Sequence, residues 1–296
     1  MPRLLARKLV LTVAAAIACG ACATLPASHG GSTLFGPIPA ASGEEDEPQI
    51  QPDQPDHTNA AYTVPPSLVQ LEVGGQWTHV GSRGDVVQTP ASVRAGIAPW
   101  FEVRTDTSGV VVVKQDGGAT TQFSGLAIGG KFRVWATPGG MVLAVAPEIT
   151  VPWGRGANGG TDALLSLLTG RDVNDRIHVD GEWAMASLSL GTADRFTQHL
   201  LSLSTSVSAT RNWQPYTEVY WYTRTEPGGA HFLGIDAGVT YYRGYRASLD
   251  VAVDTSLSDS SVRPALLFGL SVILGEVAGH HGVAARMREA QRRGDR

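Results

Sequence analysis

Few residues of this sequence have the types and spacing of a catalytic site. His199 stands close to four serines at alternate positions starting at Ser202, and a hydroxyl beside an imidazole is the nucleophile and base of many hydrolases. No motif surrounds this group, and His199 shares the parity of the apolar Leu201. His280 and His281 have no neighbouring ligands at the spacing of a metal site. We therefore expect a protein that is not an enzyme and that carries no metal or cofactor.

A larger set of charged and polar residues recurs at every second position of short segments, opposite large apolar side chains. Glu72, for example, alternates with Leu71 and Val73, and successive side chains of a β-strand point to opposite faces. The residues that this pattern places on a polar face, and that we predict to line a lumen, are Gln70, Glu72, Arg94, Glu102, Arg104, Lys131, Arg133, Glu148, Glu218, Asp236, Arg246, Asp250 and Asp254. An arginine or lysine facing lipid costs about 2–4 kcal/mol at the bilayer centre. Confinement of the charges to one parity therefore favours a transmembrane β-barrel. Two roles stay open for them: a selective constriction, or cross-strand pairs that fill a narrow lumen.

The strands that position these residues are predicted from the same alternation. They lie near residues 67–80, 86–97, 100–113, 122–135, 141–152, 181–190, 197–210, 213–224, 231–243, 245–256 and 263–274. Bacterial single-chain barrels have even strand counts, so the region between 152 and 197 holds either no strand or two. We predict two, by adding a strand within 161–179. The predicted fold class is all-β, an up-and-down antiparallel transmembrane β-barrel of about 12 strands, with ten as the alternative.

The connections between these strands alternate in length, as in an up-and-down meander. Short, periplasmic turns are predicted at residues 98–99, 138–140, 211–212 and 243–244, and longer, extracellular loops at 114–122, 153–180, 225–230 and 257–263. Aromatic residues gather near the predicted strand ends: Trp77, Trp100, Trp135, Trp153, Trp213, Tyr241, Tyr242 and Tyr245. Rings with one polar edge prefer the headgroup zone, so this distribution predicts aromatic girdles. The alternative is the aromatic core of a β-sandwich.

The two ends of the chain are predicted to lie outside the barrel. Residues 1–23 have the basic start, apolar run and A-x-A site of a secretory signal peptide. Cleavage after Ala23 removes both cysteines, Cys19 and Cys22, and lipidation of one of them is the alternative. Residues 24–60 are rich in Pro, Gly, Ser and acids, which predicts a disordered periplasmic linker. The barrel is then expected over residues 61–274, followed by a basic C-terminal tail over residues 275–296.

Composition argues against several other classes of protein. The 296 residues include 35 glycines and only 17% charged residues, which favours many short elements with turns over long helices. A net charge of -4 lacks the basic excess that binding to a phosphate backbone needs, so no nucleic acid is expected as a partner. After the predicted signal, no stretch approaches the roughly 18 to 20 unbroken apolar residues of a spanning helix. Barrel strands need no such run, so a mean hydropathy of -0.03 is compatible with a membrane protein.

Several short segments follow one another in the order found in a known family. They are Asp53-Gln54-Pro55-Asp56-His57-Thr58, Tyr62-Thr63-Val64-Pro65, Gln70-Leu71-Glu72, Val93-Arg94-Ala95-Gly96-Ile97, Phe101-Glu102-Val103-Arg104, Thr150-Val151-Pro152-Trp153-Gly154, Tyr216-Thr217-Glu218-Val219-Tyr220, Asp236-Ala237-Gly238-Val239-Thr240-Tyr241 and Ser248-Leu249-Asp250. Over residues 53–274 the chain thus resembles the outer-membrane proteins grouped under the meta-pathway of phenol degradation. The resemblance implies a barrel of that transporter family, with aromatic or other hydrophobic small molecules as cargo.

Three functions are compatible with these patterns. The first is a monomeric, porin-like channel or diffusion transporter in the outer membrane of a Gram-negative cell, with membrane lipid and a small-molecule cargo as its partners. The second is a barrel with a filled lumen that acts as a structural or surface-interaction protein. The third is a soluble, secreted β-sandwich, which keeps both the signal peptide and the alternation. We predict the first.

Overall fold

A computed structural model of the chain describes residues 32–33, 36–37, 50, 52, 57–79, 84–115, 118–123, 125–137, 140–153, 160–190, 194–258 and 264–276. The predicted signal peptide, most of the predicted linker and the predicted tail beyond Glu276 lie outside these residues. All regular structure in the described part is β-strand, including a short hairpin of β1 (Ser32–Thr33) and β2 (Gly36–Pro37). None of the described residues belongs to a helix long and apolar enough to cross a membrane.

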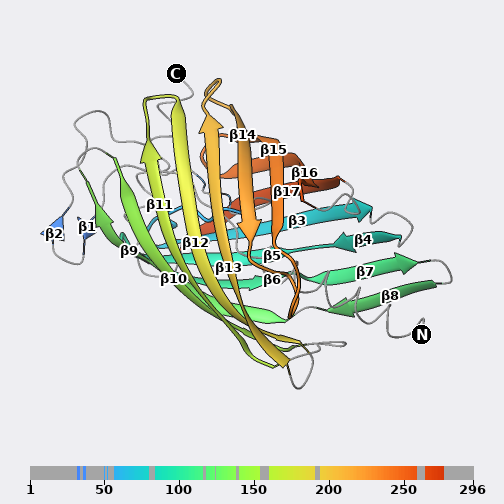
Figure 1. Cartoon of the computed structure of the whole chain (residues 1–296). Helices are drawn as coiled ribbons and strands as arrows, with labels where there is room; N and C mark the ends of the chain where they lie inside the picture. The colour runs from blue at the N-terminus through green and yellow to red at the C-terminus, as the bar shows by residue number, and fades with distance from the viewer. Residues whose placement is uncertain are drawn as a thin grey trace.

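Twelve antiparallel strands close into a barrel (Figure 1). They are β3 (Leu68–His79), β5 (Ala91–Ala98), β6 (Phe101–Thr107), β9 (Leu126–Ala136), β10 (Val142–Val151), β11 (Asp162–Asp172), β12 (Ile177–Leu190), β13 (Asp194–Val207), β14 (Trp213–Tyr222), β15 (Phe232–Arg243), β16 (Ala247–Ser256) and β17 (Ala265–Glu276). Consecutive members of this set are paired, and β17 pairs with β3. This last pairing removes the open edges that an unclosed sheet would expose.

Three further strands lengthen one side of the barrel: β4 (Asp85–Gln88), β7 (Val110–Gln115) and β8 (Gly118–Phe123). β3 pairs with β5 along one half of its length and with β4 along the other, and β7 pairs with β4 and β8. Pro90 separates β4 from β5, because proline has no N–H to donate to a ladder. Gly109 separates β6 from β7 with a φ of 63°, in the region that favours glycine. These strands project past the barrel wall on the right of Figure 1.

The predicted strand order is confirmed, including the twelfth strand, because β11 falls inside the range 161–179. A turn at residues 173–176 joins it to β12. The loop predicted at 114–122 is wrong, since β7 and β8 form a hairpin there. The residues of β8 are mostly small, polar and exposed, so they lack the alternation that marks the other strands. β17 also continues through Glu276, so the basic tail starts later than residue 275.

The outer face of the barrel is apolar and the inner face is polar. On β16, Leu249 and Val251 are 54% and 46% exposed, whereas Asp250 between them is 5% exposed. The same alternation runs around the barrel, and large apolar side chains of most strands lie on the outside. A β-sandwich would seal these residues between two sheets, so that alternative is excluded. A closed barrel with an apolar exterior is the form in which strands cross a bilayer.

The short turns gather at one end of the barrel, which we call the turn end, and we call the opposite end the loop end. The tryptophans on the outer surface form two groups, Trp135 and Trp213 towards the turn end, and Trp77, Trp153, Trp183 and Trp221 towards the loop end. Trp221 is eight positions after Trp213 on β14, which is about 26 Å along the strand and about 20 Å along the barrel axis once the strand tilt is included. This spacing agrees with the predicted girdles. Tyr242 is an exception, because its ring is buried inside the barrel, where its hydroxyl donates to Gln214 Oε1 (2.7 Å).

Candidate functional site: the barrel lumen

A piece of the chain's own N-terminal region occupies the inside of the barrel. Residues 57–66, which we call the luminal segment, precede β3 and form no helix or strand. From Thr58 to Val64 no residue is more than 4% exposed. The linker predicted over residues 24–60 therefore extends too far. Of its last four residues, Thr58, Asn59 and Ala60 are buried in the barrel and His57 is nearly so, because side chains of the inner wall bind the segment.

The luminal segment is anchored at the turn end. The Ser67 N–H donates to the carbonyl oxygen of Gly96 (2.8 Å). A Cβ on Gly96 would lie 2.1 Å from the backbone oxygen of Pro65, so only glycine allows this approach. Ile50, earlier in the chain, packs with Leu68 at the same end, and its N–H donates to the oxygen of Tyr245 in a turn. Ile50 and Ser67, on the two sides of the luminal segment in the sequence, thus both lie at the turn end.

Carboxylates of the wall bind the luminal segment along its length. Glu218 Oε2 accepts the backbone N–H of His57 (2.9 Å), and its Oε1 accepts the hydroxyl of Thr58. Glu182 Oε2 accepts both the backbone N–H and the side-chain amide of Asn59, at 2.6 and 2.9 Å. Hydrogen bonds to an ionised acceptor are stronger than neutral ones, so these contacts hold the segment without any regular structure.

A different set of contacts holds the part of the segment closest to the turn end. The backbone N–H of Val64 donates to Glu102 Oε2 at 2.6 Å. The ring of Tyr62 lies 5.7 Å from that of His178 and against Gly170. Burial raises the pKa of the Tyr62 hydroxyl, and the nearby Asp172 and Asp180 raise it further. Tyr62 is therefore a neutral, buried anchor.

One side of the wall carries the buried basic residues, and Arg94, Arg104 and Lys131 among them lie beside acids. Arg94 donates through Nε and Nη2 to the two oxygens of Glu102 (3.0 and 2.9 Å) and through Nη1 to Glu72 (3.0 Å). All three side chains are fully buried. Lys131 Nζ lies 3.9 Å from Glu102, and Gln70 donates to Glu72 (2.9 Å). We call this region, formed by β3, β5, β6, β9 and β10, the paired wall.

A second group on the paired wall is centred on Arg104. Its Nε and Nη2 donate to both oxygens of Asp106 at 2.8 and 3.0 Å, and Glu148 lies 4.0 Å away. Its Nη1 also reaches Asn59 of the luminal segment (3.4 Å). A bidentate pair fixes both distance and orientation, so Arg104, like Arg94, already has an acidic partner on the strands.

The opposite side of the lumen, formed by β12 to β16, is acidic. Glu218, Asp236 and Asp254 are directly opposite one another on β14, β15 and β16. Glu182 and Asp250 lie in neighbouring rows of the same face. Among the described residues of these five strands, no arginine or lysine is buried inside the barrel. We call this region the acidic wall.

Tyrosines brace the acidic wall. The Tyr216 hydroxyl donates to Asp250 Oδ1 (3.0 Å), and the Tyr220 hydroxyl donates to Asp254 Oδ1 (2.6 Å). Both rings reach from β14 across β15 to β16, and a Cβ on Gly234 would lie 2.2 Å from Cζ of Tyr220. Glycine at this position lets the ring lie flat against the strand, and Gly238 does the same for Tyr216.

His57 is the residue that the luminal segment places against the acidic wall. Its ring stacks on Tyr220 with centroids 3.8 Å apart, and its Nε2 lies 3.8 Å from Asp254 Oδ2. Burial lowers the pKa of the ring, but Asp254, Glu218 and Glu182 outweigh it, so the pKa of His57 is raised. When protonated, the ring supplies positive charge to the row of Glu218, Asp236 and Asp254, whose strands place no arginine or lysine inside the barrel among the described residues.

The structure tests each residue predicted to line the lumen. Those buried inside the barrel are Gln70, Glu72, Arg94, Glu102, Arg104, Lys131, Arg133, Glu148, Glu218, Asp236 and Asp250, and Asp254 is nearly so. Arg246 is a correction: it is exposed in the turn at residues 244–246, because β16 starts only at Ala247. Asp106 and Glu182 were missed, although they share the parity of Arg104 and Ala184, which face inward. The described residues contain no group of three acids, histidines or cysteines arranged to hold a metal ion.

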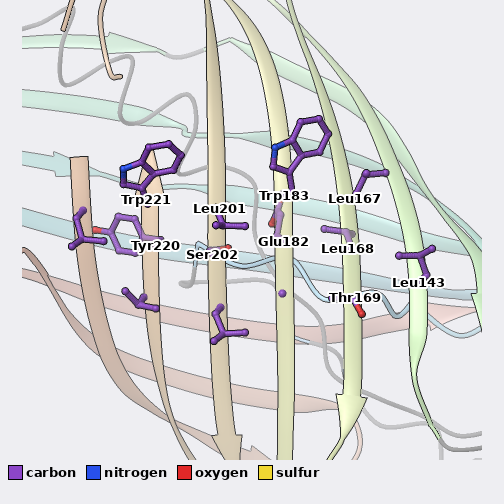
Figure 2. A pocket seen from close by; sticks show the side chains of 14 residues that line it. Leu143, Leu167, Leu168, Thr169, Glu182, Trp183, Leu201, Ser202, Tyr220 and Trp221 are labelled. Atoms are coloured by element: carbon purple, nitrogen blue, oxygen red, sulfur yellow. The ribbon is translucent and has the colours of Figure 1, made fainter. Parts of the chain in front are cut away.

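The outer surface carries a separate apolar depression of about 640 Å³. Figure 2 shows Trp183 and Trp221 on either side of Leu201, on three neighbouring strands, and Gly181 forms its floor. His199 stacks beside Trp183 on this outer face, with centroids 5.7 Å apart. His199 thus shares the apolar side of the strand, as its parity predicts.

The fold and the polar interior define a transmembrane β-barrel of the outer-membrane type. Its similarity to solved structures agrees with this class. An outer-membrane channel from Pseudomonas putida F1 superposes with a TM-score of 0.57 at 10% identity, over 72% of this chain and 98% of that one. The NanC porin has a TM-score of 0.53 at 9% identity, over 68% and 98%. The KdgM porin in complex with disordered oligogalacturonate has a TM-score of 0.51 at 8% identity, over 69% and 98%.

These likenesses are at low identity and establish the shared fold alone. No family model matches the sequence, and no curated protein matches it either. The resemblance of residues 53–274 to the proteins of the phenol meta-pathway group thus remains a resemblance. The function of the chain has to be argued from its lumen.

Proposed function

We propose that this chain is an outer-membrane channel for small molecules and that its luminal segment closes the channel from the turn end. The observation that carries the proposal is how the lumen is filled. Barrels of about eight strands are filled by their own inward side chains. Here twelve strands enclose a charged wall, and a segment held by polar contacts occupies the space between its sides.

The attachment of the luminal segment also supports a reversible closure. The segment belongs to no sheet, and Ile50 and Ser67, on its two sides in the sequence, both lie at the turn end. Its contacts with Glu182 and Glu218 are hydrogen bonds that water can replace. The segment can therefore withdraw without breaking a ladder of the barrel. Withdrawal leaves a water-accessible, charged passage.

The shared fold with porins and an outer-membrane channel supports the same function and a location in the outer membrane. We infer that the chain acts as a monomer and catalyses no reaction. The resemblance to the phenol meta-pathway proteins points to aromatic or other hydrophobic small molecules as cargo. We extend the proposal to this family and this cargo class.

A barrel that stays closed is the second candidate function, that of a structural or surface-interaction protein. The burial of Thr58 to Val64 and the ion pairs of the paired wall favour it. The two functions differ in one measurable property, because a channel passes current whenever the luminal segment is out.

A disulfide between the segment and the wall separates the two functions. Oγ1 of Thr58 and Oγ of Ser202 are 2.8 Å apart, so cysteines at both positions bring two sulfurs within bonding reach. The double variant Thr58→Cys/Ser202→Cys is made with Cys19 and Cys22 replaced by serine. Its conductance is recorded in planar bilayers under oxidising and reducing conditions, with Thr58→Cys alone as the matched control.

We expect current in the reduced double variant, its loss on oxidation and its return on reduction, while the single variant is insensitive to redox conditions. Equal current in the locked and reduced forms means that the luminal segment is not the gate. Gly96→Ala displaces the anchor of the segment and serves as a second opening variant. If neither the reduced double variant nor Gly96→Ala passes current, the proposed channel function is contradicted and the permanently filled barrel is favoured.

A further inference from the structure

The acidic wall contains a row of carboxylates on strands that place no arginine or lysine beside them inside the barrel among the described residues. Glu218, Asp236 and Asp254 are directly opposite one another on three neighbouring strands, where Cβ atoms are about 4.5–5.5 Å apart. Like charges in direct opposition destabilise a sheet. The described residues of β12 to β16 place no arginine or lysine inside the barrel. This row is therefore built for positive charge that comes from elsewhere.

Two tyrosine rings beside this row of carboxylates favour the binding of a flat group. Tyr220 stacks on the His57 ring with an interplanar angle of 27°, and Tyr222 meets the same ring edge-on at 77°. The Tyr222 hydroxyl is 3.2 Å from Nδ1 of His57. A cation over a tyrosine face gains about 0.5–2 kcal/mol from the ring. The surroundings of His57 thus combine stacking surfaces with carboxylates at one edge.

His57 occupies this place imperfectly. Its Nε2 is buried and has no hydrogen-bond partner among the described residues, and the nearest oxygen of Asp254 is 3.8 Å away. A hydrogen bond from a charged nitrogen to a carboxylate is about 2.7–2.9 Å long. An aromatic amine whose ammonium group is joined to the ring by a flexible methylene can approach Asp254 to hydrogen-bond distance. The imidazole of His57 cannot, because the backbone N–H of the same residue is hydrogen-bonded to Glu218.

We propose that Tyr220, Tyr222, Glu218, Asp236 and Asp254, together the tyrosine–carboxylate box, form a binding site for a protonated aromatic amine, and that His57 is its built-in competitor. A ligand of this class takes the place of the His57 ring and releases the luminal segment. The proposal rests on the proposed function, since it names the class of cargo that opens the channel. It narrows aromatic cargo to cations, because the box itself is acidic, and because Arg94 and Arg104 on the paired wall already have acidic partners there.

The test uses benzylamine as the probe on the full chain in detergent micelles. Benzoate has the same ring with the opposite charge, and benzyl alcohol is the neutral control. Binding is measured by calorimetry. Release of the segment is measured separately, as the rate of maleimide labelling of Thr63→Cys, a buried position outside the box, with Cys19 and Cys22 replaced by serine.

We expect benzylamine to bind with a dissociation constant on the order of 1 mM and to accelerate labelling of Thr63→Cys several-fold, with no effect of benzoate or benzyl alcohol. His57→Ala removes the competitor and should tighten benzylamine binding about tenfold. Asp254→Asn should weaken it at least tenfold. Asp250→Asn, on the same wall but outside the box, should leave it unchanged.

Equal binding of benzylamine and benzoate overturns the proposal, and so does a His57→Ala variant with unaltered affinity. His57→Ala leaves the strands intact, so this second criterion holds even if Asp254→Asn fails to fold. The outcome is independent of the channel test. Benzylamine binding and segment release without any current contradict the channel alone, and current without selective binding of the amine contradicts the box alone.

Discussion

The two sides of the lumen solve the same electrostatic problem in different ways. On the paired wall, Arg94 lies between Glu72 and Glu102, and all three are fully buried with their ion pairs formed between strands. On the acidic wall, carboxylates stand side by side, and the positive group beside them is His57 of the luminal segment. The ion pairs of Arg94 on the paired wall therefore form as soon as the barrel closes. The positive charge beside the acidic wall comes from the luminal segment, which can leave the lumen.

This difference separates stability from gating. Breaking a buried ion pair leaves a charge without compensation. A substitution on the paired wall should therefore lower the free energy of unfolding of the whole barrel. Neutralising one acid in a row of acids relieves repulsion between the strands. A substitution on the acidic wall should therefore mainly weaken the binding of the luminal segment. Four changes test this contrast.

The largest effect is expected for Arg94→Ala. The change leaves Glu72 and Glu102 buried without their main partner, which should lower the free energy of unfolding by about 3–5 kcal/mol. Equilibrium unfolding by guanidinium in micelles measures it. Arg94→Lys keeps the charge but loses the two-pronged contact and should fall between Arg94→Ala and the parent chain. An unfolding midpoint of Arg94→Ala equal to that of the parent means that this wall does not stabilise the barrel.

Glu218→Gln should behave in the opposite way. The barrel should unfold at the same or a higher guanidinium concentration, because one of three adjacent carboxylates is gone. The luminal segment should be held less tightly by about 1–3 kcal/mol, since Glu218 accepts two of its hydrogen bonds. Maleimide labelling of Thr63→Cys reports the segment. Asp162→Asn, near the loop end of β11, is the control, and slower labelling in Glu218→Gln contradicts the expectation.

A pH effect should follow from His57. Its pKa is raised in the docked segment, so its contribution to docking is fully present below the pKa of the undocked ring and is lost as pH rises through the docked pKa. Channel opening in bilayers should therefore increase a few-fold from mildly acidic to alkaline pH. Glu182, Glu218 and Asp254 are the acids that face the ring. His57→Gln should flatten the profile, and an unchanged profile in that variant assigns the effect to the acids.

The smallest effect is expected for Tyr216→Phe. It removes one hydroxyl that donates to Asp250, while Thr240 still donates to the same carboxylate. The loss should be about 1 kcal/mol in unfolding free energy, with no change in labelling of Thr63→Cys. A loss as large as that of Arg94→Ala would place the stability of the barrel on the acidic wall and end the distinction between the two walls.

The strands and their two faces were predictable from the sequence because lipid and lumen impose a strict period of two. The same rule correctly placed most of the lumen residues, and applied further it would have included Asp106 and Glu182. It failed at Arg246, where one turn residue was counted as part of a strand. Parity also shows that Tyr216 and Tyr220 lie on the same face as Glu218, but it does not show that their rings reach β16.

The luminal segment was not predictable in this way. Its residues carry no periodicity, and their burial depends on carboxylates more than a hundred positions away, such as Glu182 and Glu218. A proline- and acid-rich stretch is usually disordered, so composition pointed in the wrong direction for residues 57–60. Gly96 and Gly170, which make room for the segment, give no sign of that role without coordinates.

The seam between the first and last barrel strands sets the order in which this molecule is assembled. Gln70 pairs with Ile273, so roughly two hundred residues must be synthesised and arranged before the cylinder can shut, and pairings of such long range form slowly. The luminal segment leaves the ribosome ahead of all of them. Either the barrel strands assemble around the luminal segment, or the segment inserts into the lumen after β3 and β17 have paired. In the second case the segment inserts through the same end of the barrel that it uses when the channel opens and closes. A variant in which the segment cannot move through this end should therefore also reach its final folded state more slowly.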